Sequence, residues 1–236
     1  MNAKDVLKEL ETLGSESVKR LLMKNHGVME PCFGVKIGDM KPIVKRIKKD
    51  YQLALDLYAS GNYDAMYLAG LIADDARMTQ EDLQRWVDGA YGGSLPGSTV
   101  AAVAAQGLHG HEMALKWIDS KKPLIATAGW STLSCLMALK DDSELDAAEL
   151  KKLLQRVKKE IHQAPDAARY AMNGFVISLG GYVALLTELA IRTAEEIGPV
   201  SVDMGNNSCE VPGAADYIRK MQARGTPGKK RKTVKC

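Results

Sequence analysis

The sequence is poor in the features that mark several classes of protein. Its four cysteines, Cys32, Cys135, Cys209 and Cys236, stand far apart without a CxxC pair, which favours reduced structural thiols over a disulfide framework or a zinc site. No apolar run approaches the roughly 18 residues that a membrane span requires. The N-terminal stretch MNAKDVLKELE carries charges where a signal peptide has an apolar core. We therefore expect a cytoplasmic protein that does not enter a membrane.

Residues for catalysis or metal binding are also scarce. His109 and His111 are two positions apart, which points them to different sides of a helix, and no further His or Cys is near them. The chain has no GxSxG motif. The segment 201–212 gathers several polar residues, namely Asp203, Asn206, Asn207, Cys209 and Glu210. Its Gly and Asn residues favour a surface turn over a ligand site, and we expect neither a metal nor a cofactor.

Strand patterns are almost absent, whereas helix patterns fill the chain. Val6, Leu7, Leu10 and Leu13 form one apolar stripe with a period of 3.6 residues, and residues 145–162 form a longer one. Helix starts are predicted where a capping residue precedes such a stripe, at Ser15, Asp39 and Thr79. Phe occurs only twice, while Ala, Leu and Met are abundant. The sequence therefore predicts an all-α protein.

A weak internal repeat indicates how these helices are arranged. ALDLYAS (54–60) recurs as ALKWIDS (114–120), and each copy is followed by a helix rich in Ala and Gly. Small residues let neighbouring helices approach closely, so stacked pairs bury a shared face that no single pair buries alone. We predict a right-handed superhelical solenoid of HEAT-like repeats over residues 1–222, with a concave surface. A globular helix bundle is the alternative.

Positive charge is concentrated in two places. The net charge is +3, and residues 224–236 hold six cations and no acid, so the rest of the chain is near −3. This basic tail, residues 223–236, is either a solvated end or an arm that reaches a polyanion. In the helix expected after Asp39, four lysines fall on one face, namely Lys41, Lys45, Lys48 and Lys49. A second strip is predicted from Lys152, Arg156 and Lys159, with Lys121 and Lys122 before it in sequence.

Three segments carry a resemblance to a known family. FGVKIGDMKPIVKRI (33–47), LALDLYASGNYDAMYLAGLIADD (53–75) and RWV (85–87) resemble the N-terminal half of the DNA alkylation repair family, the AlkD-like HEAT-repeat glycosylases. The resemblance spans about residues 30–190, and the C-terminal segments indicate a divergent branch with a basic extension. It implies a concave, cationic surface that holds damaged duplex DNA. In active members, tryptophans and an aspartate assist the departure of a 3- or 7-alkylated purine.

The same resemblance places the catalytic tryptophan of the family at about Gly93 and its aspartate at about Gly97. Between Asp88 and Glu112 the chain has no carboxylate at all, so the sequence assigns no catalytic residue. The stretch YGGSLPGSTVAAVAAQG (91–107) is then interpreted as a turn capped by Ser98 that leads into a closely packed helix. A phosphate nest at that helix N-terminus is the alternative.

These observations predict a protein that contacts the phosphate backbone of duplex DNA. A catalytically silent scaffold that binds a protein partner is the alternative. The predicted nucleic-acid-binding residues are Lys41, Lys45, Lys48, Lys49, Lys122, Trp130, Lys229, Lys230, Arg231 and Lys232. The two hypotheses differ in one respect: nucleic acid is favoured if the lysine strip borders the concave surface and continues to Lys122 and the tail.

Overall fold

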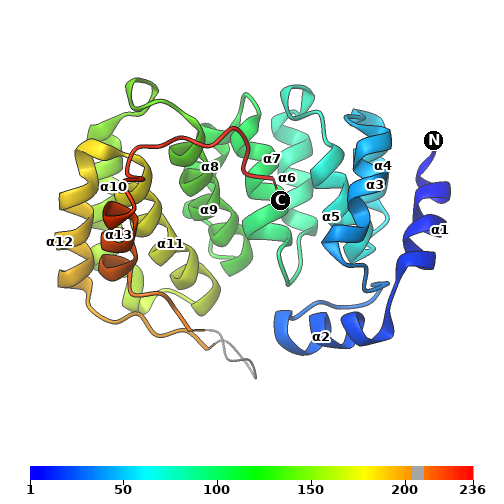
Figure 1. Ribbon diagram of the computed structural model, residues 1–236, viewed down its shortest axis with the longest axis horizontal. Coiled ribbons are helices and arrows are strands. Elements are labelled where there is room, and N and C mark those ends of the chain that lie inside the picture. The colour runs from blue at the N-terminus through cyan, green and yellow to red at the C-terminus, as the bar shows by residue number, and fades with distance from the viewer. Residues whose placement is uncertain (204–209, 236) are drawn as a thin grey trace.

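The computed structural model describes residues 1–203 and 210–235, and helices joined by loops make up most of this part of the chain (Figure 1). The α-helices are α1 (Ala3–Leu13), α2 (Glu16–His26), α3 (Ile37–Ile47), α4 (Tyr51–Ala59), α5 (Tyr63–Ile72), α6 (Gln80–Gly89), α7 (Ala101–Gln106), α8 (Gly110–Ile118), α9 (Pro123–Leu139), α10 (Ala147–Glu160), α11 (Asp166–Tyr182), α12 (Thr187–Ile197) and α13 (Ala214–Ala223). A π-helical segment, Leu95–Val100, precedes α7. No strand occurs among the described residues, and the all-α prediction is confirmed.

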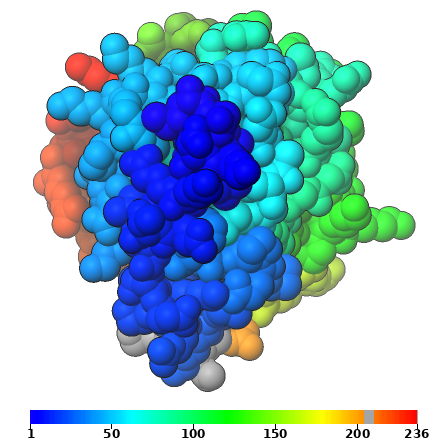
Figure 2. Space-filling view, turned by 90° about the vertical axis from the view of Figure 1, so that its right-hand side faces the viewer, coloured from blue at the N-terminus to red at the C-terminus, as the bar shows by residue number. Residues whose placement is uncertain are grey.

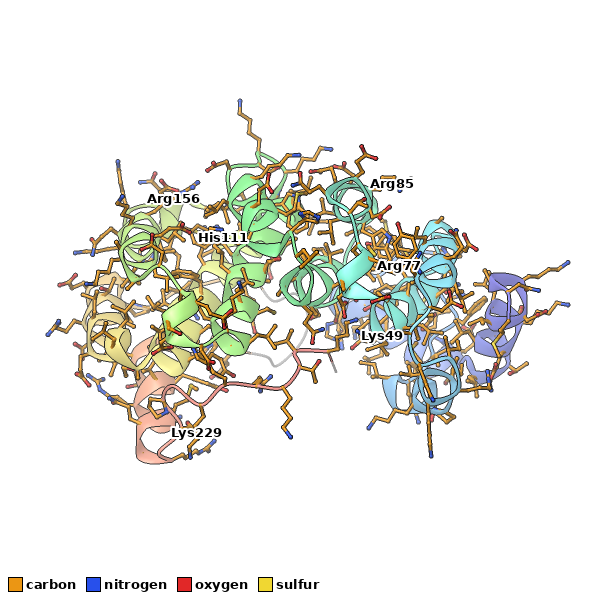
Figure 3. All side chains as sticks on the ribbon, turned by 90° about the horizontal axis from the view of Figure 1, so that it is seen from above. Lys49, Arg77, Arg85, His111, Arg156 and Lys229 are labelled. Atoms are coloured by element: carbon orange, nitrogen blue, oxygen red, sulfur yellow. The ribbon has the colours of Figure 1, made fainter. Side chains whose placement is uncertain are left out.

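The helices form two layers of a curved solenoid. Helices α5, α7, α9 and α11 follow one another in the inner layer, and α4, α6, α8, α10 and α12 form the outer layer. Seen from above, Arg85 of α6 and Arg156 of α10 lie on the outer side, whereas Lys49 and Lys229 lie on the opposite, inner side (Figure 3). The solenoid therefore has an outer side, where Arg85 and Arg156 lie, and an inner side, where Lys49 and Lys229 lie.

Small residues allow the layers to approach closely, as the repeat predicted. A Cβ atom on Gly70 of α5 would lie 2.4 Å from the Cγ2 atom of Thr99. A Cβ atom on Gly129 of α9 would lie 2.7 Å from the backbone nitrogen of Ile118 at the end of α8. Both distances are shorter than van der Waals contact, so a larger side chain at either position would force the helices apart.

The helix starts follow local capping chemistry, with two corrections. Thr79 caps α6 in a reciprocal capping box with Asp82, as predicted. Asp39 does not cap α3, because this helix begins at Ile37 with Lys36 at the N-cap, and Asp39 lies in its first turn. A carboxylate there still interacts favourably with the positive end of the helix dipole. Ser98 is also not a cap, because it lies inside the π-helical segment.

The N-terminal end of the solenoid is covered by α1 and α2 (Figure 2). The chain then enters α3 through the Phe33–Gly34–Val35 turn, which is held by a buried carboxylate. The backbone N–H groups of these three residues donate to Asp64 at 2.6, 3.1 and 2.8 Å. Asp64 is only 1% exposed, so its charge is compensated by these three donors. This carboxylate therefore has a structural task.

The core forms two clusters along the solenoid: Trp86 and Trp117 belong to the N-terminal cluster and Trp130 to the C-terminal one. Trp86 stacks on Tyr58 with ring centroids 4.1 Å apart, and Trp117 is fully enclosed.

In the described part of the chain no single helix is long and apolar enough to cross a membrane, although the bent pair 166–182 and 184–197 passes by length and composition together.

Candidate nucleic-acid interface

The basic C-terminal segment is packed along the body of the protein. We call residues 226–235 the strap; it crosses the C-terminal ends of four inner helices in turn (Figure 1). Its hydrogen bonds to these ends are Gly228 N to Gly181 O (3.0 Å), Arg231 N to Ala138 O (2.7 Å), Thr233 Oγ1 to Gln106 Oε1 (2.8 Å) and Lys235 Nζ to Ala73 O (3.2 Å). The strap is thus part of the folded solenoid.

Lys230 binds the ends of two helices. Its ammonium group donates to the carbonyl oxygen of Tyr182 at 2.7 Å and to that of Met137 at 3.0 Å. It also lies 2.7 Å from a carboxylate oxygen of Asp142. The last carbonyls of a helix lack intrahelical partners and carry partial negative charge, so a cation there is favourable. These contacts give the Lys230 charge partners within the protein.

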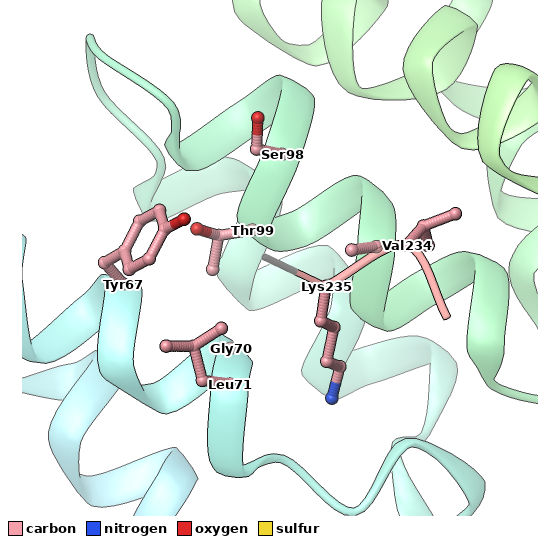
Figure 4. A pocket seen from close by; sticks show the side chains of 8 residues that line it. Tyr67, Gly70, Leu71, Ser98, Thr99, Val234 and Lys235 are labelled. Carbon is pink, nitrogen blue, oxygen red and sulfur yellow. The ribbon is translucent and has the colours of Figure 1, made fainter. Parts of the chain in front are cut away.

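Lys235 performs the same task at the end of α5, where it meets Asp75. The Lys235 ammonium group lies 2.6 Å from Asp75, whose side chain is 6% exposed. Burial lowers the pKa of Lys235, and the neighbouring Asp75 opposes this effect. Val234 and Lys235 close a cavity of about 20 Å³ against Gly70, Ser98 and Thr99 (Figure 4). The far end of the strap is therefore buried between two repeats.

Three other cations of the strap face outward. The side chains of Lys229, Arg231 and Lys232 are exposed, and in the described part of the chain they form no hydrogen bond or ion pair. The strap thus separates its cations into inward residues, Lys230 and Lys235, and outward residues. Periodicity in the sequence could not reveal this division, because the strap is neither helix nor strand.

The lysines predicted on one face of a helix are arranged differently from the prediction. The helix α3 ends at Ile47 and Lys48 has a positive φ of 64°, so only Lys41 and Lys45 belong to the helix and Lys48 and Lys49 follow it. Lys41, Lys45 and Lys48 are exposed, and no partner within residues 1–203 or 210–235 contacts their charges.

Lys49 joins these lysines to the strap. Its ammonium group lies 3.5 Å from Asp75, the same carboxylate that Lys235 contacts from the other side. The C-terminal end of α3 and the end of the strap therefore meet at one buried acid. Lys49, which follows α3, and Lys229 of the strap both lie on the inner side (Figure 3).

Two of the predicted residues lie elsewhere. Lys122 stands at the N-cap of α9 and is 3.8 Å from Asp88, whereas the strap crosses the other end of this helix, about 25 Å away for 17 residues. Trp130 does not show a face in a groove: it is 2% exposed and packs edge-on against Phe175 at 5.2 Å. It is buried because α9 is covered by α8 on one side and α11 on the other.

The second predicted strip of cations belongs to the outer layer. Arg156 donates to Asp119 at 2.6 Å and to Glu160 at 3.0 Å, and it lies on the outer side with α10 (Figure 3). Lys152 and Lys159 are exposed on the same helix. These residues therefore do not extend the inner basic region.

The glycine-rich loop at residues 91–97 is fixed by packing. Gly93 has a φ of 60°, and its backbone N–H donates to His26 O at 2.6 Å. A Cβ atom on Gly93 would lie 2.7 Å from the Tyr63 hydroxyl, and one on Gly92 would lie 2.0 Å from Gly27 O. These glycines permit the loop to lie against the end of α2. Gly97 faces α9, with Ser131 Oγ 3.2 Å from its Cβ position.

The titratable groups elsewhere in the described part of the chain do not gather into a metal-binding cluster. His111 lies 2.8 Å from Glu149, and no group of three or more His, Cys, Asp or Glu side chains within the described ranges could hold a metal ion. Burial raises the pKa of the Cys32 thiol to about 12, which keeps it protonated and unreactive at neutral pH. In the polar segment predicted as a surface turn, Asn206, Asn207 and Cys209 lie outside the described residues.

Sequence reasoning missed a second basic region at the C-terminal end. A groove with a volume of about 910 Å³ lies between α11, α13 and the strap. Tyrosine and basic side chains line it, including Tyr170, Tyr217 and Arg224. Tyr170 is 44% exposed and Tyr217 is 48% exposed. No signal in the sequence brings these residues together, because α13 docks on α11 from 30 residues away in the chain.

An all-helical solenoid with exposed cations on its inner side defines a class of repeat proteins suited to a long, anionic partner. Within this class, the chain belongs to the DNA alkylation repair enzyme family, whose model matches residues 6–199. The Listeria innocua protein Lin0241 is 34% identical over 222 residues, covering 92% of this chain and 95% of that protein. The Listeria monocytogenes protein Lmo0209 is 33% identical over the same shares.

A solved structure extends the comparison over the whole chain. It comes from a family of proteins related to the HEAT-like repeat DNA glycosylases with affinity for branched DNA structures. The two chains are 40% identical and superimpose with a TM-score of 0.92 over 100% of each. The family resemblance and the HEAT-like fold predicted from the sequence are confirmed.

Proposed function

We propose that this protein binds branched DNA through its phosphate backbone and that excision of bases is not its main activity. The observation that carries the proposal is the set of exposed cations on α3 and the strap, Lys41, Lys45, Lys48, Lys229, Arg231 and Lys232, whose charges lack an internal partner in the described structure. Cations of this kind that neutralise phosphates release the counterions condensed on the DNA, which favours binding at low salt.

The arrangement of these cations supports a partner with spaced negative charges. Lys49 and Lys235 meet at Asp75, which holds α3 and the strap together on the inner side. Backbone contacts position a protein on nucleic acid without reading its sequence. The affinity of the structural neighbour's family for branched DNA structures supports the preference for branches over a plain duplex.

The loop at residues 91–97 supports the second half of the proposal. Gly93 and Gly97, where the family resemblance places the catalytic tryptophan and aspartate, serve close packing against Tyr63 and α9. The nearest carboxylates in sequence are Asp88 and Glu112, on α6 and α8. Asp88 lies 3.8 Å from Lys122 and Glu112 accepts a hydrogen bond from Gln80, so both side chains already have partners.

The test measures binding of a labelled four-way junction and of a linear duplex with the same strand sequences, by fluorescence anisotropy at several salt concentrations. We expect tighter binding of the junction. Replacing Lys41, Lys45 and Lys48 by Ala should reduce the slope of log K against log salt by up to about 0.9 for each lost phosphate contact. The matched control replaces Lys151, Lys152 and Lys159 of the outer helix α10, which removes the same charge.

Equal behaviour of the two triple variants would exclude α3 as an interface, and absence of binding to either DNA would favour the protein scaffold. A separate measurement tests excision. Duplex DNA carrying 7-methylguanine and 3-methyladenine is incubated with excess protein in single turnover, and we expect no free base above a control without protein. Release above this control would contradict the second half of the proposal.

A further inference from the structure

The groove between α11, α13 and the strap combines flat aromatic side chains with cations. Tyr170 and Tyr182 come from α11, Tyr217 comes from α13, and Lys229 and Arg231 come from the strap. The floor contains Gly174, where an added Cβ atom would meet nothing within 4 Å. The groove is therefore open above Gly174, in a lining that includes three tyrosines.

The electrostatics of the groove favour an anion. Lys220, Arg224, Lys229 and Arg231 line it, and among the described residues no carboxylate does. Within the described ranges these four side chains form no ion pair or hydrogen bond. In contrast, the neighbouring Arg219, which does not line the groove, contacts Glu195 and lies 3.6 Å from Asp216. Asp216, the acidic residue of α13, therefore pairs with Arg219, which lies outside the groove.

The walls of the groove are held rigidly. A Cβ atom on Gly180 would lie 2.6 Å from Ile218, and one on Gly181 would lie 2.4 Å from Met221, so glycine lets α13 dock tightly on α11. The strap is fastened to the same place by the hydrogen bond from Gly228 N to Gly181 O at 3.0 Å. A site formed before binding loses little conformational entropy when its ligand arrives.

We infer that this groove binds an unpaired stretch of DNA, with tyrosine rings stacking on bases and the four cations contacting phosphates. The inference rests on the proposed function and deepens it, because a branch point is a place where a strand can leave the duplex. Grooves for single strands combine these two elements: a positive track for the backbone and aromatic faces that tolerate any base. A duplex hides its base faces, so exposed tyrosines offer it little.

The test compares a labelled oligothymidine with the linear duplex, using the full chain. Replacing Tyr170 and Tyr217 by Ala should weaken binding of oligothymidine by about tenfold for each ring that stacks and leave duplex binding unchanged. Replacing both by Phe should retain the affinity, because the ring and not the hydroxyl makes the contact. Leu108→Ser, at a side chain that is 79% exposed on another part of the surface, is the matched control.

Each outcome decides the inference. Selective loss for oligothymidine, with rescue by Phe, supports it. An unchanged affinity in the Ala variant, or an equal loss for oligothymidine and duplex, overturns it while leaving the proposed function intact if the junction still binds with a salt dependence. Absence of binding to junction and duplex alike is failure of the proposed function itself. Thermal unfolding of each variant excludes misfolding as the cause.

Discussion

The two faces of the solenoid use basic residues in different ways. On the outer layer, Arg85 contacts Asp82, Arg156 contacts Asp119, and Lys158 lies 2.6 Å from Glu196. By contrast, the exposed lysines Lys41 and Lys45 of α3 and the outward cations of the strap have no such partners within the described residues. The outer helix α10 also carries exposed lysines without such partners in the described structure, namely Lys151, Lys152 and Lys159, so the lack of a partner alone does not mark an interface, and the two triple variants decide which set contacts DNA.

The strap contains the same contrast within ten residues. Lys230 and Lys235 turn inward and donate to the last carbonyls of helices, while their neighbours Lys229, Arg231 and Lys232 stay exposed. Inward cations should therefore matter for stability, and outward cations for binding. The comparison would be contradicted by an inward substitution that weakened DNA binding at unchanged stability, or by an outward substitution that lowered stability.

The largest effect is expected for the inward lysines. Replacing Lys230 and Lys235 by Met keeps their length, but it leaves Asp142 and several helix carbonyls without these donors and leaves Asp75 with Lys49 as its remaining cationic partner. Hydrogen bonds to charged groups contribute about 1.5–3 kcal/mol when buried, and these side chains are 15% and 13% exposed. We expect the free energy of unfolding to fall by about 2–4 kcal/mol in urea titrations.

The salt dependence of DNA binding by the folded double variant should stay as in the unmodified protein. A variant of normal stability that lost affinity for DNA would assign Lys230 and Lys235 to the interface and remove the distinction between inward and outward cations.

A smaller effect is expected for the outward cations, and it concerns DNA binding instead of stability. Replacing Lys229, Arg231 and Lys232 by Ala should weaken DNA binding by about tenfold at moderate salt, equally for strands of different sequence, because contacts to phosphates carry no base information. The midpoint of unfolding in urea should change little, since the effect of exposed substitutions is usually within about 0.5 kcal/mol. A change of sequence preference in the triple variant would count against backbone contact.

The sequence predicted the fold better than it predicted the site. Apolar periodicity and the Ala- and Gly-rich helices indicated stacked helical pairs, because helix packing is encoded locally by residue size and spacing. The capping box at Thr79 was likewise visible, since its partner Asp82 is three residues away. Each of these signals depends on residues that are neighbours in the chain.

The site depends on residues that are far apart in the chain. Lys235 reaches Asp75 across 160 positions, and this contact decides whether the tail is an arm or a strap. Trp130 was predicted to bind nucleic acid, but a helix covered on both sides leaves no free face for it. Tyr170 and Tyr217 meet only because α13 folds back on α11. Composition and local periodicity do not predict contacts between residues so far apart in the chain, because these contacts depend on how the helices pack together.

The smallest effect is expected on the outer face, at the ion pair between Asp82 and Arg85. Burial tends to raise the pKa of Asp82, but hydrogen bonds from Tyr51, Thr79 and Arg85 outweigh it, so the pKa is lowered below the ordinary value of 3.8. A carboxyl whose folded pKa is depressed stabilises the protein above its unfolded pKa, and this contribution is lost as the pH falls through the folded pKa.

We expect Asp82→Asn to lower the free energy of unfolding by about 1 kcal/mol at neutral pH, the typical contribution of a helix cap, and the difference from the unmodified protein to shrink below pH 3.8. Arg85→Ala should change it by less than about 0.5 kcal/mol, because the Arg85 side chain is 71% exposed. Urea titrations at a series of pH values measure both. An Arg85→Ala variant as destabilised as Asp82→Asn would show that pairing on the outer face, and not capping, stabilises α6.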